Sequence, residues 1–117
     1  MIGLLDYALC DRTVTIYRRQ TDGIFRLVVD GCYFSWQEEQ TVDEAGCRRE
    51  TTCLLVMPGD TQRVFVGDRV LDGVGPEVEL KDWAAFIPVK VAGLAEIGYV
   101  KPYDWDGALC HVEAGRK

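Results

Sequence analysis

Turn signals recur at short intervals along this chain, and they limit the length of any regular element between them. Pro58-Gly59-Asp60 ends the apolar run 54–57, and Gly67-Asp68 follows the short run 64–66. Glycine, proline and aspartate are the residues that tight turns require, whereas the runs between them are rich in Val, Leu and Phe. The pattern predicts short β-strands joined by turns, which is typical of a small barrel or sandwich.

Strand-like runs lie on both sides of this central region, at 13–19, 24–29, 33–36, 50–57, 64–66, 70–71, 89–91, 95–100 and 108–113. Residues 77–86 instead have helical spacing, with Val78, Trp83 and Phe86 as the expected inward side chains. We therefore predict a mainly β fold, a small β-barrel or sandwich of about six to seven short strands with one short helix.

The length of 117 residues suits one domain with one modest core. We predict a single β-rich domain over 1–117, in which 1–11 form an N-terminal arm or short helix. Residues 37–49 are polar and are predicted to form an exposed loop, long enough to suggest a role in contacts. Residues 101–107 are predicted to form a further turn or loop.

The formal charge of −6 comes from 19 acidic and 13 basic side chains. A nucleic-acid-binding protein normally presents a basic face, so this balance argues against such a function. No apolar stretch is long enough to span a bilayer, and the first residues lack the basic start of a signal peptide. We expect a protein that works in the compartment where it is made.

The five cysteines, at 10, 32, 47, 53 and 110, are odd in number and form no CxxC pair. Their spacings match no zinc-binding pattern, and strand positions such as Cys32 and Cys53 suit a thiol that acts as a small apolar side chain. We expect all five to be structural thiols, with no metal bound.

The chain contains one histidine, His111, and no motif that places a nucleophile beside a base. A lone histidine in an alternating strand is more often a surface or cross-strand residue than a catalyst. Asp104-Trp105-Asp106-Gly107 is similar to the start of a calcium loop but lacks the later acceptors. We predict that the protein is not an enzyme and binds no cofactor.

Exposed aromatic and charged residues are the remaining candidates for contacts with a partner. The arginine pairs suit surface ion pairs, but arginine is also favoured at protein interfaces, so both interpretations stay open. Aromatic residues beside polar segments are candidate contact points as well. The predicted interface residues are Trp36, Glu38, Glu39, Asp43, Glu44, Arg48, Arg49, Trp105, Arg116 and Lys117.

The order of segments resembles a known family. A VTIY-type first strand is followed by an aromatic GCYFSW strand, a polar segment, and a strand ending at Pro58-Gly59-Asp60. The matching positions are Gly67-Asp68, Val70 with Gly73, Ile97 with Val100, and His111 with Gly115. This layout is similar to the small minor capsid and head-tail adaptor (head-closure) proteins of tailed bacteriophages and prophages, over residues 12–115.

The resemblance implies a structural virion protein at the head-to-tail junction, made in the bacterial host cytoplasm. It would assemble as a ring against portal, adaptor or tail proteins, with DNA only as passing cargo and no membrane partner. The acidic balance suits a channel through which DNA slides. The alternative is a stand-alone cytosolic β-barrel module that binds a protein or peptide.

Overall fold

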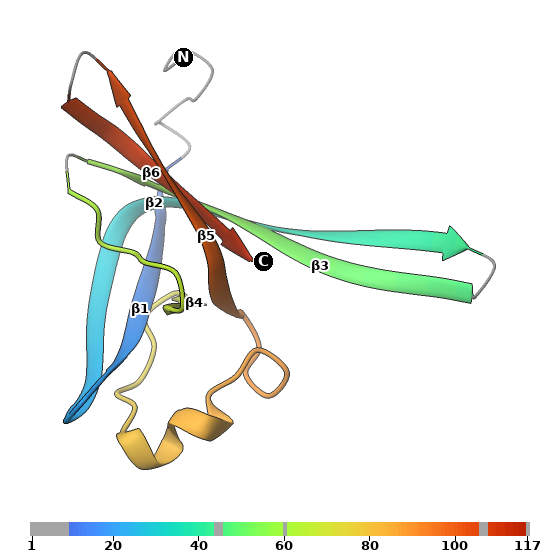
Figure 1. Ribbon diagram of the computed structural model, residues 1–117, viewed down its shortest axis with the longest axis horizontal. Coiled ribbons are helices and arrows are strands. Elements are labelled where there is room, and N and C mark those ends of the chain that lie inside the picture. Colours follow the sequence, from blue (N-terminus) through green and yellow to red (C-terminus); the bar gives the residue numbers. More distant parts are fainter. Residues whose placement is uncertain (1–9, 44–45, 60, 106–107, 117) are drawn as a thin grey trace.

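The computed structural model describes residues 10–43, 46–59, 61–105 and 108–116, with the backbone alone for 37–41, 43, 47–51, 105 and 108–110. Six antiparallel strands close into a barrel in the order β1-β2-β3-β6-β5-β4 (Figure 1). The strands are β1 (Arg12–Gln20), β2 (Gly23–Asp43), β3 (Gly46–Pro58), β4 (Arg69–Asp72), β5 (Leu94–Trp105) and β6 (Ala108–Arg116). A short 3-10 helix, η3 (Leu80–Ala85), completes the described elements. The prediction of a mainly β barrel with one short helix is confirmed.

Alternating apolar side chains of the strands fill the barrel. The main core includes Val14, Ile16, Leu55, Val70 and Ile97, all at most 1% exposed. Such alternation places every second side chain of a strand on the inner face, which excludes water from the barrel. Burial of this apolar surface is the main force that stabilises the fold.

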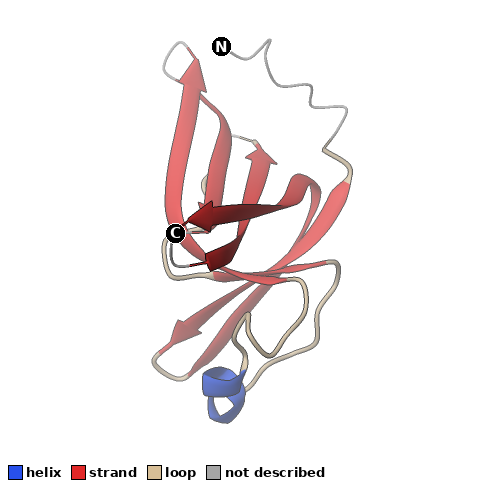
Figure 2. Cartoon of the chain, turned by 90° about the vertical axis from the view of Figure 1, so that its right-hand side faces the viewer, coloured by secondary structure: helices blue, strands red, loops and turns tan. Residues whose placement is uncertain are grey.

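The helix η3 lies at one end of the barrel (Figure 2). A second, smaller core packs beside it. Tyr17, Phe86 and Leu94 are buried there, and Val78 and Trp83 pack against them. The three inward side chains predicted for this segment therefore point as expected. The helix itself is shorter than the predicted 77–86, and Glu79 at its start makes no capping hydrogen bond with its side chain.

Two predicted strands are absent from the described structure. Residues 64–66 form an irregular segment that leads into the turn at Gly67. Val64 is buried and Val66 is exposed, whereas in a strand these two side chains would lie on the same face. Residues 89–91 form a turn, in which the N–H groups of Lys90 and Val91 donate to the carbonyl of Ile87. Residues 101–105, predicted as a loop, instead belong to β5.

The prediction of an exposed loop at 37–49 is also wrong. β2 continues to Asp43 and β3 begins at Gly46, so this polar segment is a β-hairpin. Its two strands pair with each other, and its residues are mostly polar, so the apolar pattern gave no sign of a strand. The predicted N-terminal arm or helix lies outside the described residues except for residues 10–11, which are irregular.

Candidate functional site

β2 and β3 run beyond the barrel as a two-stranded ribbon, formed by residues 36–43 and 46–53, which we call the projecting hairpin (Figure 1). β1 pairs with β2 only as far as Cys32, and β6 pairs with β3 only from Leu54 onward. Both outer edges of the projecting hairpin therefore lack a strand partner among the described residues.

An isolated two-stranded ribbon is marginally stable in water, and its free edges present unpaired N–H and C=O groups. Residues 37–43 and 46–52 are mostly polar, and Val42, one of the few apolar residues, is 76% exposed. A ribbon of this kind gains stability when another protein covers it. The projecting hairpin is therefore a candidate contact surface.

Trp36 lies at the base of the projecting hairpin. It packs against the main core with its ring centroid 5.4 Å from that of Phe34, so it is half-buried and not the exposed residue that the sequence predicted. It also lines a pocket of 430 Å³ whose other lining residues are Asp72, Pro88, Gly93, Leu94 and Arg116. The structure thus brings together two predicted interface residues, Trp36 and Arg116.

Most of the other predicted interface residues lie on the projecting hairpin. Its β2 strand carries Glu38, Glu39 and Asp43, and its β3 strand carries Arg48 and Arg49, opposite Thr41 and Gln40. One strand is therefore acidic by sequence and the other contains the arginine pair.

Two of the predicted interface residues lie away from the projecting hairpin, and two more lie outside the described part of the chain. Trp105 ends β5 on a different hairpin, where it pairs with Ala108. Arg116 ends β6 and is exposed. Glu44 and Lys117 lie outside the described residues.

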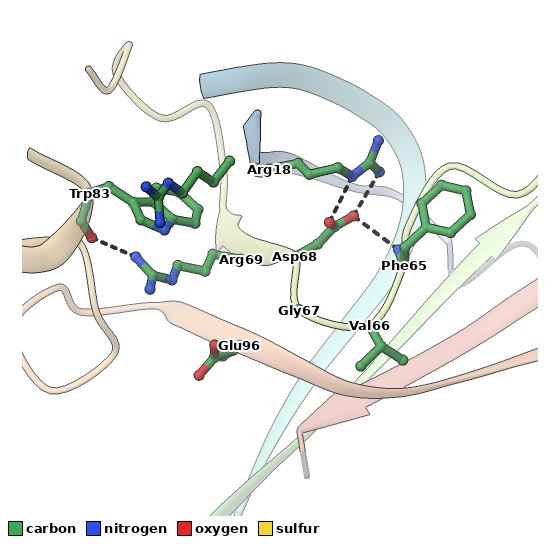
Figure 3. A pocket seen from close by; sticks show the side chains of 9 residues that line it. Arg18, Phe65, Val66, Gly67, Asp68, Arg69, Trp83 and Glu96 are labelled. Carbon is green, nitrogen blue, oxygen red and sulfur yellow. Dashed lines mark hydrogen bonds and ion pairs between the residues drawn. The ribbon is translucent and has the colours of Figure 1, made fainter. Parts of the chain in front are cut away.

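A second surface surrounds an ion pair between β1 and the segment before β4 (Figure 3). The Arg18 guanidinium donates to both carboxylate oxygens of Asp68, from Nε and Nη2, each at 2.8 Å. The Arg18 guanidinium also lies over the rings of Phe25 and Phe65, with distances of 5.1 and 4.6 Å to the centroids. The hydrogen bond with Asp68 raises the pKa of Arg18. Because Asp68 is only 2% exposed, this pair fixes β1 to the 65–68 segment.

Gly67 shapes the turn next to this ion pair. Its φ of +93° is in the left-handed region, and the Asp68 N–H donates to the Phe65 carbonyl at 3.1 Å, which is the geometry of a type II turn. The Phe65 N–H donates in turn to the Asp68 carboxylate at 2.9 Å. The turn leaves Phe65 and Val66 43% and 65% exposed.

Arg69 connects the same region to η3. Its Nη1 donates to the carbonyls of Trp83 and Phe86 at 2.6 and 2.8 Å, and its guanidinium lies 3.8 Å from the Trp83 ring centroid. Burial lowers the pKa of Arg69, and the nearby Glu96 opposes this shift. Carbonyls at the end of a helical segment are suitable acceptors for an arginine. Arg69 therefore holds η3 against the barrel.

A pocket of 440 Å³, which we call the arginine pocket, lies between these residues (Figure 3). Arg19 lines it, is exposed, and has no ion pair or hydrogen bond within the described part of the chain. The complete lining consists of Arg18, Arg19, Phe65, Val66, Gly67, Asp68, Arg69, Trp83 and Glu96.

The arginine pocket was not predicted from the sequence. Its residues come from segments about fifty positions apart, such as Arg18 and Asp68, and no local motif links them. The only available signal was Gly67-Asp68, which we interpreted as a turn and as one of the positions that carry the family resemblance. The bidentate pair shows that this turn also organises a surface.

His111 has a cross-strand position. It pairs with Tyr103 of β5, and the two rings stack with their centroids 4.8 Å apart. Burial lowers the pKa of His111 below its ordinary value. The stacked arrangement accounts for this residue as a packing element of β6.

The described residues hold no group of three or more His, Cys, Asp or Glu side chains placed to bind a metal ion. In the same part of the chain, no helix has the length and apolar character needed to cross a membrane.

The reactivity of the buried cysteine thiols tests whether their side chains lie inside the barrel. Burial raises the pKa of Cys32 to about 11 and also raises that of Cys53. Near pH 8 about one Cys32 thiol in a thousand is then ionised, because each pKa unit is a factor of ten. We expect brief alkylation of the native protein to label the half-buried Cys10 well before Cys32 or Cys53, as measured by peptide mass spectrometry. After denaturation, Cys10 and Cys32 are expected to be labelled equally. Equal labelling in the native protein would contradict the buried position of Cys32.

Comparison of this chain with family models, with curated proteins and with solved structures finds no match.

Proposed function

We propose that this protein is a structural component of a bacteriophage or prophage particle, at the junction between head and tail. It assembles there as a ring against portal, adaptor or tail proteins. The observation that carries the proposal is the combination of a small closed barrel with a projecting hairpin whose two edges are unpaired in the described structure. A barrel supplies a rigid body, and an uncovered ribbon supplies a contact segment for neighbours.

The layout of segments supports the same proposal through its likeness to head-closure proteins. Gly115, one of the positions that carry the likeness, is buried where β6 pairs with both β3 and β5, close to the point at which the projecting hairpin leaves the barrel. The acidic balance of −6 suits a ring through which DNA passes without binding. The virion is accordingly the proposed location, after synthesis in the host cytoplasm.

Disruption of the gene in the phage that encodes the chain tests this function. We expect disruption to yield separate heads and tails and no infectious particles, because the junction is incomplete. Electron microscopy of the lysate and the infectious titre are the measurements, and a plasmid copy of the wild-type gene is the control. Normal infectious particles from the disrupted phage would refute the proposal. A chain that works alone as a cytosolic binding module predicts that outcome.

Substitutions in the projecting hairpin refine the test. We expect complementation with Arg48→Glu/Arg49→Glu to fail while the protein still folds, since these residues lie on the ribbon outside the barrel. A matched reversal at Lys90, an exposed residue in the turn after Pro88, is expected to complement normally. Normal titres from the hairpin variant would show that the arginine pair makes no required contact.

A further inference from the structure

The projecting hairpin extends away from its own barrel. Residues 36–43 form a strand of about 25 Å at roughly 3.3 Å per residue. In Figure 1 the hairpin extends to the right of the barrel, whereas η3, which contributes Trp83 to the arginine pocket, lies at the bottom. Within the described structure the strands of this hairpin pair only with each other. The hairpin end is therefore presented to a neighbouring molecule.

The arginine pocket has more positive than negative charge. Its lining has three arginines and two carboxylates, a net charge of +1, and Arg18 forms a bidentate ion pair with Asp68. Arg19 remains exposed, without a described partner for its charge. The exposed side chains of Phe65 and Val66 form an apolar rim at the same site. The site suits a ligand that carries both a carboxylate and an aliphatic side chain.

The β2 strand of the projecting hairpin has this chemistry. Between residues 37 and 43 it contains Glu38, Glu39 and Asp43 and no basic residue. Val42, at the far end of the same strand, is 76% exposed. An exposed valine and neighbouring carboxylates thus match the apolar rim and the arginines of the pocket.

We propose that the acidic strand of the projecting hairpin of one copy docks on the arginine pocket of a second copy. Val42 covers Phe65 and Val66, and the carboxylate of Glu38, which lies four residues earlier on the same face of the strand, approaches Arg19. The two surfaces differ, so the contact is heterologous, and repetition gives a ring when the rotation closes. This inference rests on the proposed function, because it names the contact by which copies of the ring join.

A charge exchange tests the contact. Wild-type protein is expected to associate with rising concentration in sedimentation velocity runs, and to dissociate as salt is added, since the contact is partly ionic. We expect Arg19→Glu alone, or Glu38→Arg/Glu39→Arg alone, to weaken association at least about tenfold. Lys90→Glu is the matched control and leaves association unchanged. Arg19 and Lys90 are both exposed, so the fold of these variants is preserved.

The mixture of the two variants is the decisive measurement. In the mixture, the hairpin of Glu38→Arg/Glu39→Arg carries positive charge and can dock on the pocket of Arg19→Glu, which carries negative charge at residue 19. The hairpin of Arg19→Glu and the pocket of the other variant are both wild type and can dock as well. Association of the equimolar mixture is therefore expected to return to near the wild-type level. A mixture as weak as either variant alone overturns the proposal, as does wild-type protein that stays monomeric up to millimolar concentration. The proposal is also overturned if the hairpin substitutions weaken association and Arg19→Glu does not. That result would assign the contact to the edges of the hairpin.

The gene-disruption experiment distinguishes failure of this inference from failure of the proposed function. Normal head-to-tail joining by the Arg19→Glu variant would refute the docking contact and leave the phage function intact. Self-association that follows the charge exchange, in a chain that phage assembly does not require, would refute the phage function and leave the contact intact.

Discussion

Replacement of Arg18 by Ala is expected to lower the free energy of unfolding by about 3 kcal/mol, and the melting temperature by roughly 10 °C. The substitution leaves the carboxylate of Asp68, which is only 2% exposed, with the Phe65 N–H as its remaining described hydrogen-bond donor. A buried charge that has lost its counterion costs far more than the pair contributed in the first place. The Arg18 side chain is 31% exposed, so water reaches part of the site and the lower end of the usual range applies.

Thermal and urea unfolding of Arg18→Ala and of the control Arg12→Ala provide the measurement. Arg12 lies on the same strand and pairs with Asp72 at 3.4 Å, but the two side chains are 56% and 35% exposed. Exposed pairs of this kind contribute at most about 1 kcal/mol. Equal losses for the two variants would show that the Arg18–Asp68 pair has no special role in the fold. Arg18→Lys is expected to fall between them, because lysine keeps the charge and loses the planar two-point geometry.

Gly115→Ala is the substitution with the second largest expected effect, a loss of about 2–3 kcal/mol. A Cβ at this position would lie 2.6 Å from the Tyr99 ring and 2.7 Å from the carbonyl oxygen of Cys53. The tyrosine ring is a side chain, but the carbonyl belongs to the backbone of β3 and moves only with that strand. Relief of the clash therefore requires a shift between β3 and β6, at the point where the barrel ends and the projecting hairpin begins.

Gly23→Ala is the matched control for this prediction. An added Cβ at Gly23 has no atom within 4 Å, and its φ is not in the left-handed region. Urea unfolding is expected to show a change of only a few tenths of a kcal/mol for this control, mainly through the entropy of the unfolded chain. Loss of stability in both variants would mean that the effect is a general cost of replacing glycine in this barrel and not a clash at Gly115.

The amino-acid sequence determined the fold class and much of the core. Alternation predicts the burial of Val14 and Ile16 in segment 13–19 and of Ala95 and Ile97 in segment 95–100, because a strand places successive residues on opposite faces. Thr15 and Tyr17, on the other face of the first segment, are buried as well, and the alternation did not show this. The inward residues of the segment before Pro88, Val78, Trp83 and Phe86, followed from helical spacing in the same way. These features are local, so a single sequence contains them.

The projecting hairpin was decided only by the tertiary structure. Residues 37–49 are mostly polar and show no alternation of apolar and polar side chains, so they were predicted to be a loop. Only the pairing of β2 with β3 shows that they form a ribbon. A polar loop of about a dozen residues is itself unusual in a small domain. The length of this segment was therefore the one sign in the sequence that it contains regular structure. The predicted contact residues of this segment, apart from Glu44, which lies outside the described residues, nevertheless lie on one ribbon because β2 pairs with β3.

The arginine pocket likewise required the three-dimensional arrangement. Closure of the barrel places β1 beside β4, and this pairing brings Arg18 to Asp68 across fifty residues of sequence. Turn residues such as Gly67 could be recognised from the sequence because a positive φ favours glycine. Ion pairs and pockets depend on which strands become neighbours, and long-range pairing leaves no local pattern in a single chain.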